Sequence, residues 1–495
     1  MSSKIIKNRD AAFIFYFLFF AVMKFFMVVS ALFITLFGHA LAQFDYCFGK
    51  DTERSQTRQF TTKTAYQIIK GTNIDKQYLV PHCLPQKIWI FHRHGTRLPS
   101  RSIIEKASRL EELRDAIVKN YRVLRTAPST NALCQEDLIA LQMWKWNSSI
   151  TPDMEEYLTS QGYEDLRGTA RHYQKLYPNV LIKEYNNTYY LFRHTDSQRT
   201  TESFKAFTDS LFGMHNNAVA EKIPEEDKLL RPYDYCEPWT ANNNDDENSE
   251  VNKYKRSVLW NDTLMEISTR LGFQYTLESK DVELMYDICR YEQAWQVDRT
   301  SVWCGAFTPP QVTVFEYAED LKYYYKFGYG SDINAHLNCR IVQNMIEHLG
   351  SNALPNVQVS FAHSAGLQTL MSALGINKDD RPLTANNYQS MSERKWKTSN
   401  IDPFAGNFVA VKYECNNAPL EKEKVIFFLN QNAVDLDWCH VGLCNWSEVV
   451  QRYEHIINAD CDSYYCPGVG ALSAKPISIA VTLLMSAIIY LINLI

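Results

Sequence analysis

Two spacings of apolar residues alternate along the chain, and each predicts a different kind of element. Short runs rich in β-branched or aromatic residues, bounded by turn residues, predict strands at 87–91, 188–192, 357–361, 407–413 and 424–430. Apolar residues three or four positions apart predict helices at 158–177 and 366–375, and Gly375 stands where a helix would end. Strands that alternate with helices indicate an α/β fold, in which helices flank a core sheet.

The strand pattern fades between residues 213 and 350, where helix-like stretches with many aromatic residues replace it. We interpret 213–350 as a helical cap inserted into the α/β core. The core then has a first part at 43–212, which contributes residues near 101–150 to the cap, and a second part at 351–466. The run ANNNDDENSE at 241–250 predicts a solvated polar loop.

Both ends of the chain are strongly apolar, and each has the pattern of a targeting segment. Residues 23–42 have a charged start, an apolar middle and an Ala-x-Ala finish, which predicts a signal peptide at 1–42 with cleavage before Gln43. A signal anchor is the alternative. The tail at 467–495 has small residues, a short spacer and a terminal hydrophobic run without a basic flank. This pattern predicts a GPI anchor on the outer face of the cell membrane, with a C-terminal transmembrane span as the alternative.

The composition is that of a globular protein from an oxidising compartment. Of 495 residues, 46% are hydrophobic and 22% charged, and the length allows two or three domains. The twelve cysteines, an even number, fit a compartment in which disulfides form. The closely spaced pairs Cys439/Cys444 and Cys461/Cys466 lack the matching second pair that a zinc site needs, so we expect local disulfides there and no metal.

Two further features bear on location and partners. Four Asn-x-Ser/Thr sequons suit a secretory route and are candidate glycosylation sites: Asn147, Asn186, Asn261 and Asn445. A net charge of −5 argues against nucleic-acid binding, which usually needs a basic face.

Arginines and histidines gather at the ends of three predicted strands. They are Arg93, His94 and Arg97, then Arg193 and Arg199, and finally His363. Because α/β proteins bind ligands at the carboxyl ends of strands, these side chains predict one convergent cationic site. A neutral histidine can attack phosphorus, and guanidinium groups bind phosphate by paired hydrogen bonds. Each fragment alone is also compatible with a structural role, as a salt-bridged turn or a hydrogen-bonded core histidine.

The motif RHGTRLP, the later arginine-rich turn and the later strand-end histidine resemble the histidine acid phosphatases of branch two. Within that family, the chain is most similar to the multiple inositol polyphosphate phosphatase group. The likeness covers most of the chain, in LTSQGYEDLRGTARHYQKLYP, FRHTDSQRT, LLRPYDYC, FEYAEDLKYYYKFGYG and KDDRPLTANNY. The resemblance implies a histidine-phosphatase-like core sheet with an inserted helical cap, and chemistry that uses no metal or other cofactor.

The resemblance also implies residue roles. His94 would be the nucleophile that becomes phosphohistidine, and His363 would be the second histidine at the phosphate. Arg93, Arg97 and Arg199 would hold the phosphate oxygens. Arg193 has no firm counterpart in the family, and we treat it as a local structural charge.

One departure from the family concerns the proton donor. The family usually follows the second histidine with an acid, as His-Asp or His-Ala-Glu, whereas this chain has Ser364 and Ala365. Ala365 thus replaces the glutamate that would protonate the leaving alkoxide. A carboxylate from elsewhere could substitute, and the candidates are Glu316, Asp320, Asp379 and Asp380.

The sequence therefore predicts a phosphomonoesterase that acts on inositol polyphosphates and, as the resemblance implies, on 2,3-bisphosphoglycerate. A surface-displayed pseudophosphatase that binds polyanions without turnover is the alternative outside the enzymes. The missing acid favours it, and the intact nucleophile opposes it. A generic acid phosphatase for small esters is the alternative within the enzymes.

Overall fold

The structure is a computed structural model that describes residues 46–71, 80–242, 246–416, 421–439 and 442–466. The expected signal segment at 1–42 and the expected anchor tail at 467–495 lie outside the described residues. No helix in the described ranges combines the length and the apolar character needed to cross a membrane.

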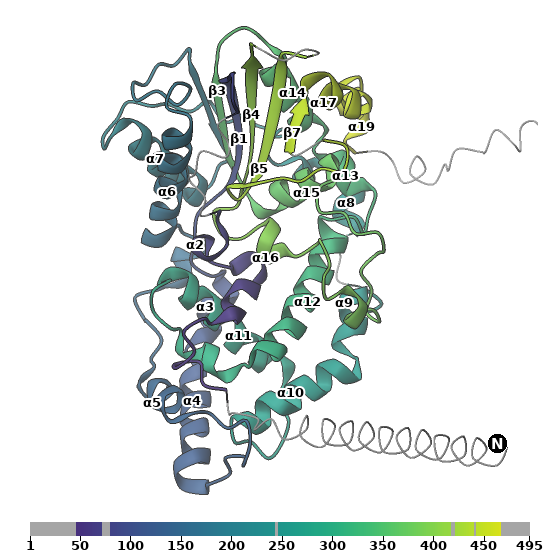
Figure 1. Ribbon diagram of the computed structural model, residues 1–495. Coiled ribbons are helices and arrows are strands. Elements are labelled where there is room, and N and C mark those ends of the chain that lie inside the picture. The colour runs from purple at the N-terminus through teal and green to yellow at the C-terminus, as the bar shows by residue number, and fades with distance from the viewer. Residues whose placement is uncertain (1–45, 72–79, 243–245, 417–420, 440–441, 467–495) are drawn as a thin grey trace, which may run out of the picture.

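A seven-stranded sheet occupies one end of the molecule (Figure 1). Its strands are β1 (Cys83–Arg93), β2 (Tyr190–His194), β3 (Val357–Ala362), β4 (Asn407–Cys415), β5 (Glu423–Leu429), β6 (Asn432–Ala433) and β7 (Leu443–Asn445). The order is β2-β3-β1-β4-β5-β6, and β7 pairs with β5. All the strands expected from the sequence are present.

The three strands that carry the candidate site run parallel. β3 lies between β1 and β2, with Arg93 opposite Ala362 and His194 opposite Phe361 in the registers. Their carboxyl ends therefore meet at one edge of the sheet. β4 and β5 continue the sheet in antiparallel pairs beyond β1.

Helices cover both faces of the sheet. Successive side chains of β1 point to opposite faces, so each set packs against its own pair of helices. Ile88 and Ile90 pack in one hydrophobic cluster with α6 (Ser160–Leu176) and α7 (Gln198–Phe212). Trp89 and Phe91 pack in another with α14 (Cys339–Gly350) and α15 (Ser364–Leu374). The two helices expected from the sequence, α6 and α15, are confirmed, and α15 ends at Gly375 with a left-handed φ of 73°.

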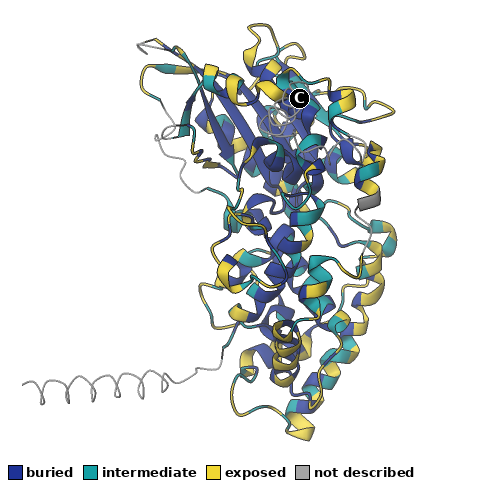
Figure 2. Ribbon diagram, turned by 90° about the vertical axis from the view of Figure 1, so that its right-hand side faces the viewer, coloured by how far each residue is buried: buried dark blue, intermediate teal, exposed yellow. Residues whose placement is uncertain are grey.

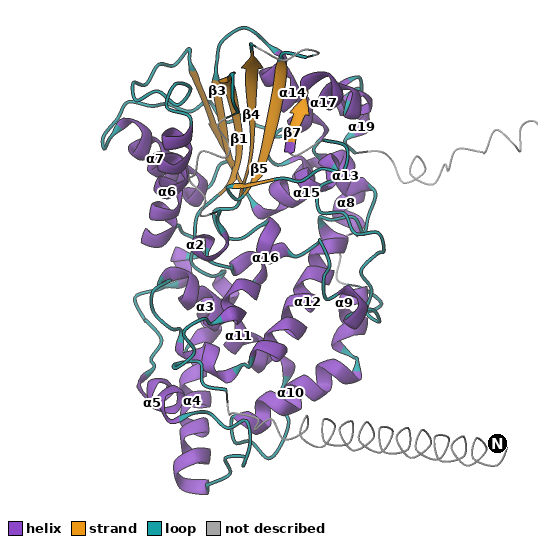
Figure 3. Ribbon diagram, in the orientation of Figure 1, coloured by secondary structure: helices purple, strands orange, loops and turns teal. Residues whose placement is uncertain are grey.

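A second group of helices lies beyond the carboxyl edge of the parallel strands, and the strands are confined to the other end of the molecule (Figure 3). This group consists of α3 (Arg101–Ala107), α4 (Arg109–Lys119), α5 (Gln135–Met143), α9 (Glu250–Lys255), α10 (Val258–Arg270), α11 (Ser279–Trp295) and α12 (Pro309–Lys326). A single hydrophobic cluster runs from the sheet into these helices, which Figure 2 shows as dark blue ribbon. The expected cap range 213–350 also contains α14, which contacts β1 and β4 beside the sheet.

Shorter elements complete the described chain. The helices are α2 (Tyr66–Ile69), α8 (Glu237–Asn242), α13 (Ile333–Leu337), α16 (Thr398–Ile401), α17 (Trp446–Arg452), α18 (Glu454–Ile457) and α19 (Cys461–Tyr464). Single turns of other helix types occur at η1 (Ser55–Gln59), η2 (Thr61–Lys63), η4 (Asn120–Leu124), η5 (Pro152–Met154), η6 (Pro232–Tyr235), η7 (Val302–Ala306) and η8 (Gln389–Met391).

All twelve cysteines lie in the described residues and form six disulfides, which agrees with an oxidising compartment. The pairs are Cys47–Cys134, Cys83–Cys415, Cys236–Cys466, Cys289–Cys304, Cys339–Cys461 and Cys439–Cys444.

The local disulfide expected at Cys439 and Cys444 is confirmed, but the one expected between Cys461 and Cys466 is wrong. Cys461 begins α19, whereas Cys466 lies two residues beyond the end of that helix. The two sulfurs therefore face different neighbours, Cys339 on α14 and Cys236 next to α8.

Candidate active site

A pocket of ≈ 340 Å³ opens at the carboxyl edge of the parallel strands. Its lining includes every residue that the sequence assigned to catalysis or phosphate binding: Arg93, His94, Arg97, Arg199 and His363. The three strand ends thus meet in one cationic site, as the positions of these residues at the strand ends predict.

His94 lies immediately after β1 and is almost fully buried. Its Nδ1 lies 2.9 Å from the carbonyl oxygen of Gly95, which can only accept a hydrogen bond, so the ring proton is on Nδ1. Nε2 then carries the free lone pair. Burial, and after it the charges of Arg199 and Arg93, hold the pKa of His94 well below its usual value. The ring is therefore a neutral potential nucleophile even in mildly acidic solution.

The glycine after His94 has a steric reason. A Cβ on Gly95 would lie 2.3 Å from the carbonyl oxygen of Gly162, at the start of α6. Two backbone segments approach closely here, and Thr159 donates its backbone N–H to the oxygen of Thr96 at 2.9 Å. The Arg-His-Gly sequence thus lets the strand end pack against a helix N-terminus and fixes the direction of the His94 ring.

His363 is the residue before α15, and its ring centroid lies 5.7 Å from that of His94. Its Nε2 lies 2.9 Å from Oγ1 of Thr195, and its Nδ1 lies 3.3 Å from NH2 of Arg199. Because Arg199 can only donate, Nδ1 accepts and Nε2 carries the proton. Burial, followed by the charge of Arg199, lowers the pKa of His363 well below its usual value. Both rings in the pocket are thus neutral.

The three predicted arginines are each held by protein contacts. NH1 of Arg93 donates to the carbonyl oxygens of Thr62 and Asp402, both at 2.7 Å, and the guanidinium lies over the Phe404 ring. Fixed guanidinium groups around His94 are suited to bind a tetrahedral anion without reorganising.

Glu156 is a site residue that the sequence analysis missed. Its Oε1 lies 3.3 Å from NH2 of Arg97, and its Oε2 lies 3.0 Å from NH1 of Arg199. Its backbone is left-handed, with φ of 59°, which is unfavourable for a side chain larger than glycine. One carboxylate thereby orients two guanidinium groups. Nothing in the local sequence marks it, because the pairing depends on three separate segments.

Three more cations line the pocket and were also missed: Arg231, Lys322 and Lys326. The two lysines stand four residues apart on α12, so they share one face of that helix. The segments LLRPYDYC and FEYAEDLKYYYKFGYG, which hold these cations, resemble the family, but a basic residue on a helix is ordinarily a solvated one. The pocket has no carboxylate among its described lining residues.

The four carboxylates proposed as substitute acids all lie outside this pocket. Glu316 and Asp320 form ion pairs with Arg394. Asp379 accepts hydrogen bonds from the backbone N–H groups of residues 395 and 396. Asp380 lines a different cavity. Arg193 is also outside, in an ion pair with Glu221 at 2.5 Å, so it is a local structural charge.

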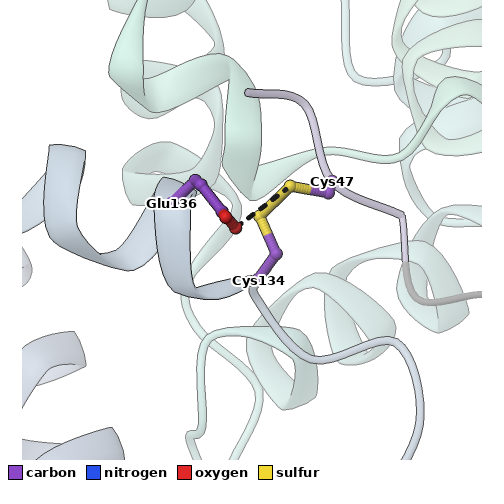
Figure 4. A group of neighbouring side chains, drawn as sticks. All are labelled: Cys47, Cys134 and Glu136. Carbon is purple, nitrogen blue, oxygen red and sulfur yellow. Dashed lines mark hydrogen bonds between the residues drawn. A yellow bond between two sulfur atoms is a disulfide. The ribbon is translucent and has the colours of Figure 1, made fainter. Parts of the chain in front are cut away.

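One group of potential metal ligands occurs in the described part of the chain: Cys47, Cys134 and Glu136. Figure 4 shows the two sulfurs joined in a disulfide with the carboxylate of Glu136 beside them. Disulfide sulfurs are not thiolates and do not hold zinc, and Glu136 forms an ion pair with Lys50 at 2.9 Å. This group is therefore a surface cross-link.

A histidine with a free ring nitrogen can attack phosphorus, and the arginines around it can bind the phosphate oxygens at the carboxyl edge of the sheet. Residues 87–429 match the family described as Histidine phosphatase superfamily (branch 2), and the chain belongs to that family. The resemblance found in the sequence is confirmed.

Named relatives agree with this assignment. The chain is 64% identical over 455 residues to Multiple inositol polyphosphate phosphatase 1 of Drosophila melanogaster, covering 90% of this chain and 97% of that protein. It is 27% identical over 440 residues to Multiple inositol polyphosphate phosphatase 1 of Homo sapiens, covering 82% and 88%.

Solved structures share the fold. The phytase from D. castellii superposes with a TM-score of 0.64 at 18% identity, over 83% of this chain and 90% of that one. Bifidobacterium longum Multiple Inositol Polyphosphate Phosphatase, in complex with inositol hexasulfate, gives 0.57 at 11% identity, over 82% and 98%. The expected histidine-phosphatase-like α/β fold is confirmed.

Proposed function

We propose that this chain is a phosphomonoesterase that removes phosphate from inositol polyphosphates through a phosphohistidine on His94. The observation that carries the proposal is the pocket lining: a neutral histidine with a free nitrogen and six cationic side chains, without a carboxylate among the described lining residues. The chain's similarity to proteins named multiple inositol polyphosphate phosphatase supports this substrate class.

The chemistry proceeds in two displacements at phosphorus. Nε2 of His94 attacks in line, the P–N bond forms, and the bond between phosphorus and the inositol oxygen breaks with transfer of a proton to that leaving oxygen. Arg93, Arg97 and Arg199 bind the equatorial oxygens and compensate their charge. Water then attacks phosphohistidine, loses a proton, and releases inorganic phosphate and neutral His94.

The additional cations support a substrate that carries several phosphates. Three guanidinium groups suffice for the phosphate that is transferred, so Arg231, Lys322 and Lys326 are available for neighbouring phosphates. Their charge contrasts with the net charge of −5 for the whole chain. A site that concentrates positive charge attracts polyanions and holds them close to the nucleophile. 2,3-Bisphosphoglycerate, with two phosphates, would use fewer of these contacts.

The test is phosphate release by the purified chain from inositol hexakisphosphate, 2,3-bisphosphoglycerate and an aryl phosphate. Rapid quenching with labelled substrate should trap an acid-labile phosphate on the protein, and His94→Ala should abolish both label and turnover. His455→Ala, which changes an exposed histidine outside the pocket, is the matched control. Undiminished label in the His94 variant would exclude the mechanism, and binding without release would identify a pseudophosphatase.

We also propose that the protein passes through the secretory pathway and is held on the cell surface by a GPI anchor that replaces the tail at 467–495. The six disulfides support an oxidising compartment. A phosphatidylinositol-specific phospholipase should release the protein from intact cells. Retention of the protein, with a C-terminal tag still present, would indicate a transmembrane tail instead.

N-glycosylation at the four sequons belongs to the same proposal. Asn147, Asn186 and Asn261 are exposed, whereas Asn445 is half-buried and caps α17. We therefore expect glycans at the first three positions and the lowest occupancy at Asn445. Mass spectrometry before and after treatment with an N-glycosidase measures the occupancy of each site.

A further inference from the structure

The proposed reaction needs a proton for the leaving oxygen, and no carboxylate belongs to the described pocket lining. A hydroxyl group does: Ser364, the first residue of α15, follows His363 and lines the pocket. Its Oγ donates a hydrogen bond to Oδ2 of Asp402. Asp402 comes from the segment between α16 and β4 and is not among the described lining residues of the pocket.

Asp402 is completely buried. Its Oδ2 also accepts a hydrogen bond from Nε2 of Gln368 at 2.9 Å. Its Oδ1 has no hydrogen-bond partner among the described residues, and the nearest cation is NH1 of Arg93, at 3.5 Å. A buried carboxylate with an unsatisfied oxygen is unfavourable, whereas a protonated carboxyl group places a hydrogen on that oxygen or on its neighbour.

We propose that Ser364 and Asp402 form a proton relay to the leaving oxygen of the substrate. This inference rests on the proposed function and names the acid that the proposed reaction requires. Ser364 touches the leaving group, and Asp402 acts through Ser364.

The relay balances in each half-reaction. In the reacting state the carboxyl proton of Asp402 is on Oδ2 and is donated to Oγ of Ser364, whose own hydroxyl hydrogen turns from Asp402 to the leaving oxygen. When the bond between phosphorus and the leaving oxygen breaks, Oγ of Ser364 passes its proton to that oxygen and takes the proton from Oδ2 of Asp402. Asp402 is then a carboxylate beside Arg93. When water attacks phosphohistidine, its proton returns through Ser364 to Asp402, and the starting state is restored.

The groups that face Asp402 hold its pKa in the range that a proton donor needs in mildly acidic solution. Burial raises the pKa of Asp402 to about 6, while Arg93 on β1, Ser364 and Gln368 on α15, and Lys63 on η2 act in the opposite direction. Asp402 is therefore protonated below about pH 6 and ionised above it. Since the pKa of His94 is well below its usual value, the acid and the nucleophile are both in their active forms in mildly acidic solution.

Tyr323 is the rival proton donor, because its side chain also lines the pocket. Burial raises the pKa of its phenol, but the ammonium groups of Lys63 and Lys322 more than offset this, and the pKa lies below its usual value. We favour Ser364 and Asp402 because their hydrogen bond joins the pocket to a buried carboxyl group that can resupply the proton.

The test compares variants on two leaving groups. Asp402→Asn and Ser364→Ala should each lower kcat on inositol hexakisphosphate on the order of 10²-fold, the usual contribution of a general acid. Both should change kcat on an aryl phosphate much less, because a phenolate leaves without a proton. Ser372→Ala, on the same helix but outside the pocket, is the control and should affect neither substrate. Thermal unfolding of each variant shows that it is folded, and Ser364→Ala decides the question if Asp402→Asn does not fold.

The pH profile supplies the second readout. Wild-type kcat on inositol hexakisphosphate should fall as the pH rises through about 6, and this limb should be absent in Asp402→Asn. Equal losses on both substrates would overturn the relay, as would a selective loss in Tyr323→Phe alone. Labelling of His94 by the aryl phosphate tests the proposed function separately, since it needs the nucleophile and not the relay.

Discussion

Replacement of Arg199 tests the proposed phosphate-binding arginines. We choose this arginine because its guanidinium contacts two other site residues in addition to the proposed substrate. NH2 lies 3.3 Å from Nδ1 of His363, and NH1 lies 3.0 Å from Oε2 of Glu156. In Arg199→Ala, the phosphate loses one donor and the His363 ring loses the hydrogen bond that sets its tautomer. Glu156 keeps only Arg97 as a partner, so the negative charge of its carboxylate near the phosphate is less well compensated.

The size of the effect follows from the two kinds of interaction that the Arg199 guanidinium makes. Removing one preorganised donor to a transition-state oxyanion costs about 3–4 kcal/mol, or roughly 10²–10³-fold in kcat. The ion pair with Glu156 contributes less, since its side chains are 21% and 32% exposed and partly solvated pairs are worth about 0.2–1 kcal/mol. The expected loss is therefore dominated by the missing donor to the phosphate.

Steady-state kinetics on inositol hexakisphosphate measure this loss. Arg199→Lys should recover little of it, because an ammonium group cannot reproduce the planar fork that reaches two neighbours at once. Arg193→Ala is the matched control, since Arg193 pairs with Glu221 outside the pocket. If Arg199→Ala retains more than about a tenth of wild-type kcat, below the usual effect of removing one such donor, the assigned role is refuted. Equal losses in the Arg193 and Arg199 variants would also refute it.

Three further predictions use the same preparation. Because the pKa of His94 lies well below 6.5, kcat/KM for an aryl phosphate should show no acid limb near pH 6.5; a limb centred there would contradict the neutral nucleophile. Ala365→Glu should lower turnover on both inositol and aryl phosphates, because it adds a negative charge to a pocket that binds anions, and a selective gain on inositol phosphates would instead reveal a vacant acid position. Replacing Cys289 and Cys304 by alanine opens a loop with a sequence separation of 15 and should lower the free energy of unfolding by about 3 kcal/mol in urea denaturation, with an unchanged midpoint as the contrary result.

The sheet was predictable because its strands are local features. Each is a short run of apolar residues that must be buried on one or both faces, and such runs are visible without knowledge of their neighbours. The same holds for α6 and α15, whose spacing and final glycine are local signals. The expected disulfide between Cys461 and Cys466 failed for the converse reason, because closeness in sequence does not specify which distant segment each sulfur contacts.

The site divides in the same way. Arg93, His94, Arg97, Arg199 and His363 could be found from sequence because each lies at or just beyond the end of a parallel strand, and parallel strands bring those ends together.

Residues from other parts of the chain were not predictable on that basis. Lys322 and Lys326 stand on a helix, where the sequence cannot tell a pocket face from a solvated one. Glu156 acquires its role only by lying between two arginines from different segments.

The sequence by itself was enough to predict His94, the arginines and the strands that carry them, because these depend on local burial and on the geometry of parallel strands. Only the tertiary structure decided which further charges face the pocket and which buried carboxyl group contacts Ser364. Asp402 and Ser364 are 38 residues apart, and their hydrogen bond exists because α15 and the segment before β4 pack side by side at the sheet edge. Contacts of this kind depend on how elements pack in space, and the pattern of apolar residues along the chain does not specify that packing.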